Sequence, residues 1–439
     1  MGLQNSPFLF RWSLAKSRLV HEVDAPSDNN AAMTVRRPVA CNECGTVTVT
    51  RTSIGHLDYQ EFAFPCPGCA VEIRFGMTLD QKAPSFDYTL LKNGKWVEGE
   101  SAAKSELRFD SENLSSQLPG AQAMPFIETV FLARDVESSR KEFGQRFSAM
   151  RTGWPIIEKM LVHEANENLE LFNRALSQLT RQAVANSNLE MAARLLSVLD
   201  QFGSEFLWDE GVVRRRITAL LDKASSKEAP LRDALAYYTS EQRLDSLWRQ
   251  LTAIRRNWGE VYFMVAPIYW ELSWDLSKAS LDDYTLCQKR FEDLRGFFVD
   301  CFETFCRLST VAAAFEGITE IDQFLIPSPA RPRPVSDLEL MPNGNKHTLL
   351  NQLQHGDIFI PFIDAKLRNG VGHNSAHYDI TTDTIRYQNH SSSRGIEEFS
   401  ISYVRFCEKL VRLYGQLEAC APLVHFLRMR QKLSSVSQP

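Results

Sequence analysis

The chain has 439 residues, of which 44% are hydrophobic and 23% are charged, and its formal net charge is −5. These values are typical of a globular protein with about two or three domains, and they exclude a polycationic nucleic-acid-binding chain. No apolar run reaches the length that a transmembrane helix requires. We therefore expect a cytoplasmic protein without a membrane partner.

The first hundred residues have the pattern of a small β module. Segment 45–52 alternates β-branched and small residues, and 88–99 predicts a hairpin that turns at Asn93. The polar, serine-rich segment 99–119 predicts a linker. We therefore place the β module over 1–100.

The rest of the chain is predicted to be mainly helical. Apolar residues recur at helical spacing at Leu244, Leu247, Leu251, Ile254, Trp258, Val261 and Val265, and again at Leu294, Phe297, Cys301, Phe305, Leu308 and Phe315. The proline-rich segment 326–335 predicts a connection between two helices, 377–388 a β-hairpin, and 396–431 a final helix. The expected fold is mainly α, with a helical middle region over 101–235 and a helical domain over 236–439.

Four of the nine cysteines form two C-x2-C units, Cys41 with Cys44 and Cys66 with Cys69, separated by 21 residues. The odd total without a signal peptide indicates a reducing compartment, so we expect no disulfide framework. Two such units in strand-rich sequence are typical of a zinc ribbon, where four thiolates complete a closed tetrahedral site. We expect these four cysteines to bind a structural zinc ion that supplies much of the module's folding energy. A ribbon can bind nucleic acid, bind protein or cap the next domain.

The sequence LRNGVGHNSAHYD at 367–379 contains two of the nine histidines. His373 and His377 are four residues apart, which on a helix would place both imidazoles on one face, as in a metal site. The zinc-protease pattern H-E-x-x-H requires a glutamate after the first histidine, and this chain has Asn374 there. The pattern therefore favours a partner for His373 other than a metal.

Arg368 precedes His373 by five positions, and Asn369 follows the arginine directly. This arrangement resembles the R-x4-6-H motif of the HEPN superfamily, in which asparagine frequently follows the arginine. The resemblance extends over about 240–432, where long helical segments flank the motif. Gly370 and Gly372 depart from the small apolar residues that are more usual between the two motif residues.

The resemblance implies a metal-independent endoribonuclease. The 2′-OH of RNA would attack the adjacent phosphate, while His373 transfers a proton and Arg368 stabilises the charge that develops on the phosphate oxygens. Asn369 would orient these groups by hydrogen bonding. The products would carry 2′,3′-cyclic phosphates.

Three neighbouring residues are secondary candidates. His377 and Tyr378 could position the RNA substrate, and Asp364, one helical turn before Arg368, could pair with it. Each could equally be an ordinary loop or surface residue. The arginine runs at 214–216 and 255–256 predict solvated helix faces.

HEPN proteins usually bring two motifs together across a dimer interface. Since this chain has one convincing copy, the resemblance implies a homodimer with a composite active site and RNA as its substrate. Within that superfamily such enzymes act as prokaryotic toxins or in antiviral abortive infection. The alternative is a non-catalytic protein whose ribbon binds nucleic acid or a protein partner, and whose HEPN-like bundle mediates dimerisation.

Overall fold

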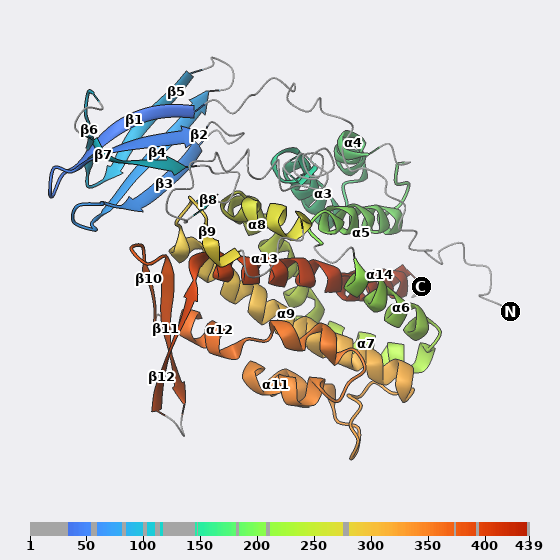
Figure 1. Ribbon diagram of the computed structural model, residues 1–439. Helices are drawn as coiled ribbons and strands as arrows, with labels where there is room; N and C mark the ends of the chain where they lie inside the picture. Colours follow the sequence, from blue (N-terminus) through green and yellow to red (C-terminus); the bar gives the residue numbers. More distant parts are fainter. Residues whose placement is uncertain are drawn as a thin grey trace.

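The structure is a computed structural model that describes residues 34–53, 59–80, 85–99, 103–109, 115–116, 145–146, 148–180, 184–207, 211–274, 281–372, 375–391 and 395–436. An N-terminal β module lies at one end of a larger helical body (Figure 1). Helices predominate outside the β module, so the expected mainly α fold is confirmed at this level.

The β module consists of two sheets. One has the order β6-β1-β2-β7, formed by β6 (Gly94–Trp96), β1 (Thr34–Cys41), β2 (Val47–Ser53) and β7 (Ala103–Phe109). The other has the order β3-β4-β5, formed by β3 (Tyr59–Pro65), β4 (Glu72–Asp80) and β5 (Ser85–Lys92). The rings of Phe75 and Phe109 lie 5.6 Å apart edge to face and join the two sheets in one core.

Two expectations for this module are wrong. Strands β5 and β6 pair in different sheets, so the turn at Asn93 carries the chain from one sheet to the other and closes no hairpin. Strand β7 lies within the segment predicted as a linker and pairs in parallel with β2. Its inward residues Leu107 and Phe109 alternate with charged ones, and the polar composition of the region hides this pattern.

The helical body is built around long helices that match the predicted apolar stripes. The helices are α3 (Trp154–Ala165), α4 (Leu169–Leu179), α5 (Asn188–Ser204), α6 (Val212–Ser225), α7 (Glu228–Thr239), α8 (Arg243–Trp274), α9 (Phe291–Glu320), α10 (Val335–Leu340), α11 (Asn343–Leu350), α12 (Ala365–Gly372), α13 (Tyr403–Cys420) and α14 (Pro422–Val436). Short helical turns are η1 (Ala149–Gly153), η2 (Ser240–Gln242), η3 (Leu281–Asp283), η4 (Gly356–Ile358) and η5 (Ile360–Phe362). None of the helices in the described ranges combines the length and apolar character needed to cross a membrane.

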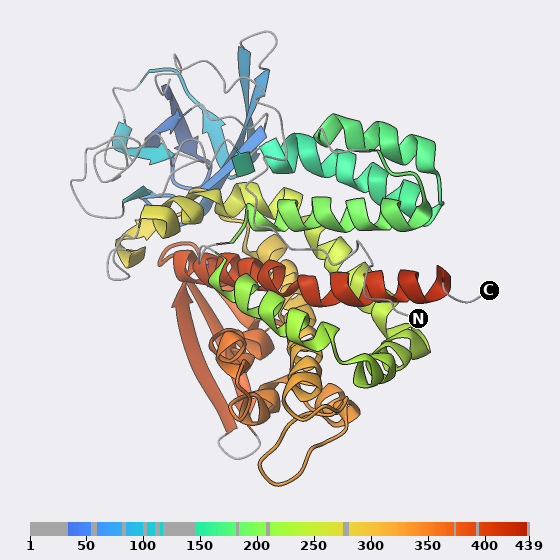
Figure 2. The same ribbon diagram turned by 90° about the vertical axis from the view of Figure 1, so that its right-hand side faces the viewer.

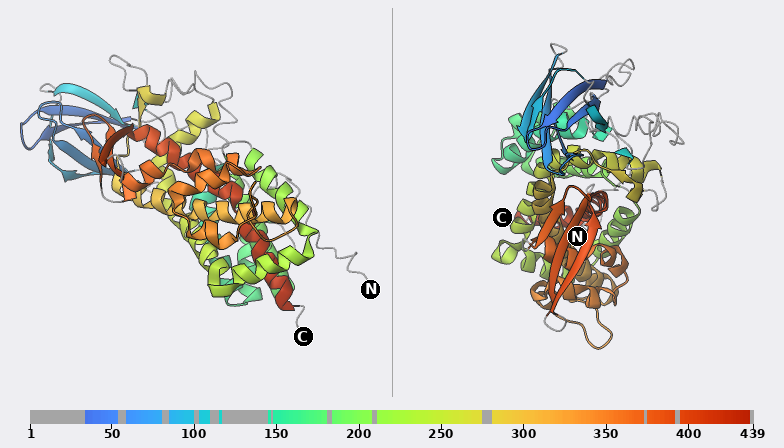
Figure 3. Two further views of the ribbon diagram at one scale, coloured as in Figure 1. Left: turned by 90° about the horizontal axis from the view of Figure 1, so that it is seen from below. Right: turned by 60° about the vertical axis from the view of Figure 1, so that its left-hand side comes forward.

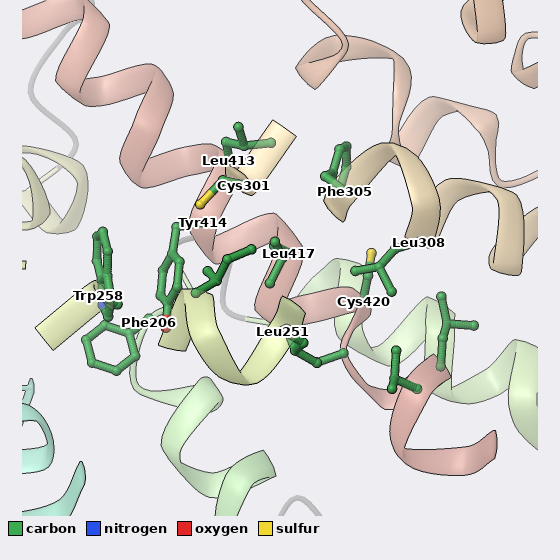
Figure 4. Packing of buried hydrophobic residues seen from close by; sticks show 14 of the residues in the cluster. Phe206, Leu251, Trp258, Cys301, Phe305, Leu308, Leu413, Tyr414, Leu417 and Cys420 are labelled. Atoms are coloured by element: carbon green, nitrogen blue, oxygen red, sulfur yellow. The ribbon is translucent and has the colours of Figure 1, made fainter. Parts of the chain in front are cut away.

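Helices α8, α9 and α13 pack against one another, and α3 to α5 (teal to green in Figure 2) cover one side of this group. Aromatic side chains fill the interface: Trp258 of α8 stacks on Tyr414 of α13 at 3.9 Å between ring centroids, with Phe206 beside them (Figure 4). Burial of a side chain of this size contributes roughly 2–3 kcal/mol. The apolar periodicity read from the sequence therefore marks the core.

A three-stranded antiparallel sheet interrupts the helices near the C-terminus (Figure 3). Its strands are β10 (Ala376–Asp379), β11 (Thr384–Ser391) and β12 (Gly395–Ser402), in that order. The predicted hairpin over 377–388 is confirmed, but the final helix does not begin at 396. Phe399 stacks on Tyr387 across the β11–β12 pair, and helix begins only at Tyr403, in α13.

The β module and the helical body are joined by the connection between α8 and α9. Strand β8 (Ser115–Ser116) pairs with β9 (Tyr284–Thr285) in that connection. Cys287, two residues later, is buried in the apolar core of the β module together with Phe62 and Phe75. One residue of the body is thus part of the module's core.

Candidate functional site

The four predicted metal ligands come together between two tight turns. Cys41 and Cys44 lie in the turn from β1 to β2, and Cys66 and Cys69 lie in the turn from β3 to β4. In the first turn the Gly45 N–H donates to the Cys41 carbonyl at 3.0 Å, and a matching hydrogen bond of 2.8 Å closes the second. These tight turns hold the thiols of both pairs toward one point.

The geometry of the four sulfur atoms fits a tetrahedral metal ion. All four Sγ atoms lie within 4.8 Å of one another, with 3.7 Å between Cys41 and Cys69 and 3.6 Å between Cys44 and Cys66. A tetrahedron with metal–sulfur bonds of about 2.3 Å has edges of about 3.8 Å. An all-sulfur donor set at this spacing suits a thiophilic ion such as Zn²⁺.

The thiols of this cluster do not ionise alike. Hydrogen bonds with the Thr46 side chain and backbone lower the pKa of the Cys44 thiol to about 6. Burial instead raises the pKa of the Cys66 thiol. A hydrogen bond from the Val71 amide acts to lower the pKa of Cys69, but desolvation and the adjacent thiols raise it to about 12. Four thiolates this close therefore require a cation between them.

The second predicted site begins on α12. Asp364 caps this helix, because its Oδ1 accepts from the Leu367 N–H at 3.0 Å, and Leu367 and Val371 anchor it in the core. Gly370 lies against Tyr387 of β11, so closely that a Cβ there would come within 2.4 Å of the ring. Gly370, which departs from the motif that the sequence resembles, thus allows α12 to pack on the sheet, and the helix continues through it.

Arg368 projects from α12 into a polar cluster at the surface of α9. Its Nη2 lies 2.5 Å from Glu303 Oε1, and its Nη1 donates to Asn369 Oδ1 at 3.2 Å. Glu303 in turn accepts from Asn343 Nδ2 at 2.6 Å. Within the part of the chain that the structure describes, the Arg368 Nε is buried and has no hydrogen-bond partner, while the side chain as a whole is 25% exposed. The guanidinium is therefore fixed in position yet reachable from solvent.

Of the other candidates, His373 is not described by the structure and Asp364 has a different side-chain partner. His373, the proposed catalytic partner of Arg368, lies outside the described residues, as does Asn374. Asp364 does not pair with Arg368, since its Oδ2 lies 3.2 Å from Lys409 Nζ. The expected Asp364–Arg368 pair is replaced by Glu303–Arg368.

His377 and Tyr378 point to opposite faces of the C-terminal sheet. His377 is exposed and pairs in register with Arg386, whereas the neighbouring pair of Ala376 and Tyr387 faces α12. Tyr378 instead donates to Asp383 Oδ1 at 2.7 Å, and burial beside this carboxylate raises its pKa. His377 thus lies on the face of the sheet opposite to Arg368, and Tyr378 is engaged in a structural contact.

Asp383 forms part of a polar clamp at the junction with the β module. Its carboxylate accepts from Thr285 Oγ1 at 2.5 Å and pairs with Lys289 Nζ at 2.7 Å, in addition to its bond with Tyr378. Lys289 also lies over the ring of Tyr403 at the start of α13. The clamp ties the α8–α9 connection to the C-terminal sheet.

Two arginines predicted to be solvated are buried in a network of charged side chains. Arg255 donates to Glu418 from Nε at 2.9 Å and from Nη2 at 2.7 Å, with both side chains fully buried. His425 lies 3.3 Å from Arg255 Nη1 and 2.9 Å from Asp200, which pairs with Arg214 at 2.5 Å. Since all five side chains are buried, the network joins helices rather than forming a solvent-accessible reaction site.

Sequence reasoning missed Glu303 and Asn343 in the Arg368 cluster. Glu303 carries no distinct signal, because Arg295, Asp300 and Arg307 are also charged residues of the same helical segment. Asn343 lies in the short segment after the proline-rich connection and gives no sequence signal of this role. Glu303 reaches Arg368, and Asn343 reaches Glu303, only through the packing of α9, α11 and α12.

Comparison of the chain with protein-family models, with curated proteins and with solved structures finds no match.

Proposed function

We propose that this protein is a metal-independent endoribonuclease of the HEPN type, with Arg368 and His373 as its catalytic residues. The observation that carries the proposal is the setting of Arg368. It is fixed by Asn369 and Glu303 on a helix packed into the bundle, it remains partly exposed, and it lies five positions before a histidine.

The chemistry needs no metal, because RNA supplies its own nucleophile. The 2′-OH attacks the adjacent phosphorus, the bond to the 5′-oxygen breaks, and a 2′,3′-cyclic phosphate and a free 5′-OH are formed. His373 would transfer the proton, and the Arg368 guanidinium would bind the non-bridging oxygens as negative charge develops. Asn369, bonded to Arg368 at 3.2 Å, would orient that guanidinium.

The proposed enzyme acts as a homodimer in which two copies of the motif form one composite site, in a cytoplasmic toxin or antiviral effector. These features rest on the resemblance of the motif. A monomer that cleaves RNA at the same rate as the dimer would contradict the composite site.

The deciding experiment compares Arg368→Ala and His373→Ala with two controls, Arg386→Ala on the outer face of the sheet and His163→Ala on α3. We expect each motif variant to lose roughly 100-fold or more of its RNA cleavage in EDTA, and each control to retain it. Equal cleavage by motif and control variants would exclude this active site.

One observation favours the second candidate function, a non-catalytic nucleic-acid- or protein-binding protein. Glu303 compensates the charge of Arg368 at 2.5 Å, as in a structural ion pair. In that case purified protein would show no cleavage with any RNA, and Arg368→Ala would change only stability or dimerisation.

We also propose that the ion of the four-cysteine site is Zn²⁺, in a structural role. Elemental analysis should find about one zinc per chain, and replacement by Co²⁺ should give the absorption of a tetrahedral thiolate site. Cys44→Ser should abolish both signals, whereas Cys420→Ser, in the helical body, should preserve them.

A further inference from the structure

The proline-rich segment between α9 and α10 forms a closed loop that projects from the helical body (Figures 1 and 2). Ile326 and Arg333 form an antiparallel bridge at its base, with N–H···O distances of 2.8 and 3.0 Å in the two directions. The six residues between them read PSPARP, and Pro334 follows the bridge. The chain bends at Pro329 and Ala330 and returns to the base through the arm Arg331–Pro334.

The base of this loop is held firmly by the helical body. Ile326 and Val335, on either side of it, are buried in the main core, and Phe324 packs on Tyr237 at 5.4 Å. A Cβ on Gly317 would come within 1.7 Å of the Leu325 carbonyl, so the chain folds back tightly at the end of α9. A loop fixed in this way loses little conformational entropy when it binds a partner.

The tip of the loop is solvent-exposed and carries two arginines that form no ion pair within the part of the chain that the structure describes. Every residue from Pro329 to Pro334 is exposed. The side chains of Arg331 and Arg333 are in this stretch, and each precedes a proline, which favours an extended backbone. The loop therefore presents fixed proline rings and positive charge together.

From Pro332 to Pro334, the backbone of the returning arm offers hydrogen-bond acceptors but no available donors. Pro332 and Pro334 have no N–H, and the N–H of Arg333 is already bonded to Ile326. Pro334 has φ −56° and ψ 145°, the geometry of polyproline II. Such an edge cannot be extended by an added β-strand, because a strand needs alternating donors and acceptors. A partner must supply donors itself.

We propose that the loop Pro327–Pro334 is a docking site for a second protein that has an aromatic-lined groove with an acidic rim. Aromatic grooves of this kind bind proline rings and polyproline II backbone, and their tryptophan and tyrosine side chains donate to proline carbonyls. Carboxylates on the rim would pair with Arg331 and Arg333, whose guanidinium planes also stack on aromatic rings.

Nucleic acid fits the loop less well. Phosphate groups are acceptors, so they would use the two arginines and leave the proline carbonyls and rings without partners. The loop also lies apart from the Arg368 cluster, because Glu303 and Glu320 are 17 positions apart on α9, which corresponds to about 25 Å. Docking here is therefore independent of the proposed RNA cleavage.

The test uses the full-length protein and a panel of purified SH3 and WW domains, with binding measured by biolayer interferometry. We expect at least one domain to bind, and the affinity to fall about tenfold or more in Pro329→Ala/Pro332→Ala and in Arg331→Ala/Arg333→Ala. Ser328→Ala in the same loop and Arg386→Ala on the C-terminal sheet serve as controls that should bind normally. A cyclic peptide with the sequence of residues 326–335 should compete.

Failure of every domain to bind would overturn the proposal, and so would binding that the proline variants leave unchanged. Single-stranded RNA and duplex DNA are measured in parallel. Binding of an oligonucleotide that is lost in the arginine variants and retained in the proline variants would identify a phosphate contact and contradict a protein partner. Thermal denaturation confirms that each variant is folded, as expected for changes at an exposed tip.

Discussion

Arg255 and Glu418 form a two-point ion pair in which neither side chain is exposed to solvent. The pair connects α8 to α13 in the centre of the body. In Glu418→Gln the Arg255 charge would remain buried without its counter-charge, so we expect a loss of about 3–5 kcal/mol in the free energy of unfolding. Urea denaturation followed by circular dichroism measures it.

The matched control is Asp357→Asn, which breaks the surface pair between Arg216 and Asp357. Because both partners are exposed, Asp357→Asn should lower the free energy of unfolding by less than about 1 kcal/mol. Equal costs for the two variants would show that the buried pair contributes no more than a surface one.

His425 makes the stability of the body sensitive to mild acid. Arg255 Nη1 can only donate, so His425 Nε2 accepts from it and Nδ1 donates to Asp200, which requires a neutral imidazole. Burial lowers the pKa of His425, although the Asp200 hydrogen bond opposes the change and the Arg255 and Arg214 charges add to it. The unfolded chain thus binds the proton more readily, and stability should fall as pH drops below about 6.5.

The measurement is the urea midpoint at pH 7.5 and pH 5.5. His425→Asn keeps a neutral donor near Asp200 and should flatten the difference between the two midpoints, whatever its effect at pH 7.5. The pKa of Asp200 is itself lowered, so its contribution persists to more acidic pH. An unchanged slope in the variant would assign the acid sensitivity to another group.

Lys346 is buried on α11, and among the described residues its Nζ has a single long contact of 3.4 Å, with the Cys306 carbonyl. Burial lowers the pKa of this amine, so the folded state disfavours its charge. Lys346→Met keeps an unbranched chain without the charge, and we expect the free energy of unfolding at pH 7 to rise by about 1–2 kcal/mol.

The gain from this substitution should shrink as the pH approaches the ordinary lysine value of about 10.4, because the unfolded chain then loses its proton as well. Lys366→Met on α12, where the amine is exposed, is the control and should change stability little. A less stable Lys346→Met variant at pH 7 would mean that the ammonium group is favourably placed.

If Arg368 contacts RNA, the negative charge of Glu303 should weaken RNA binding. Glu303→Gln keeps an oxygen acceptor for the guanidinium and for Asn343 but removes the negative charge beside the site. We expect the KM for RNA to fall several-fold with little change in kcat, because a polyanionic substrate is repelled less.

Glu292→Gln, on the same helix and paired with Arg295, gives the same change in net charge away from the site. It should leave the KM unchanged. A KM that falls equally in both variants would reflect overall charge, and a KM that rises in Glu303→Gln would assign Glu303 to substrate binding.

Local patterns account for what the sequence could predict. The C-x2-C spacing places two thiols in one turn, and the stripe ending at Phe315 places apolar side chains on one face of α9, whatever the rest of the chain does. The ion pairs of the Arg368 cluster and of the buried network do not follow from local patterns. Arg368 and Glu303 are 65 residues apart, and Asp200 and His425 are 225 apart, so no periodicity connects them.

The two strands that the sequence did not predict, β7 and β12, also depend on contacts between distant parts of the chain. Residues 395–402 form strand β12 because they pair with β11. Residues 103–109 form strand β7 because they pair with the edge of β2. Tertiary pairing decides such segments, and a sequence read alone assigns them to the neighbouring helix or linker.

The position of Cys287 has a consequence for how this molecule could be divided or recombined. The β module completes its core with a residue supplied from the other part of the chain, and β8 and β9 fasten the same connection. A fragment that ends after β8 would lack Cys287 and would have a cavity in the core of the β module. A zinc ribbon taken from another protein would have no pocket that accepts Cys287. The β module and the helical body therefore cannot be exchanged independently of each other, and we expect them to be inherited as one unit.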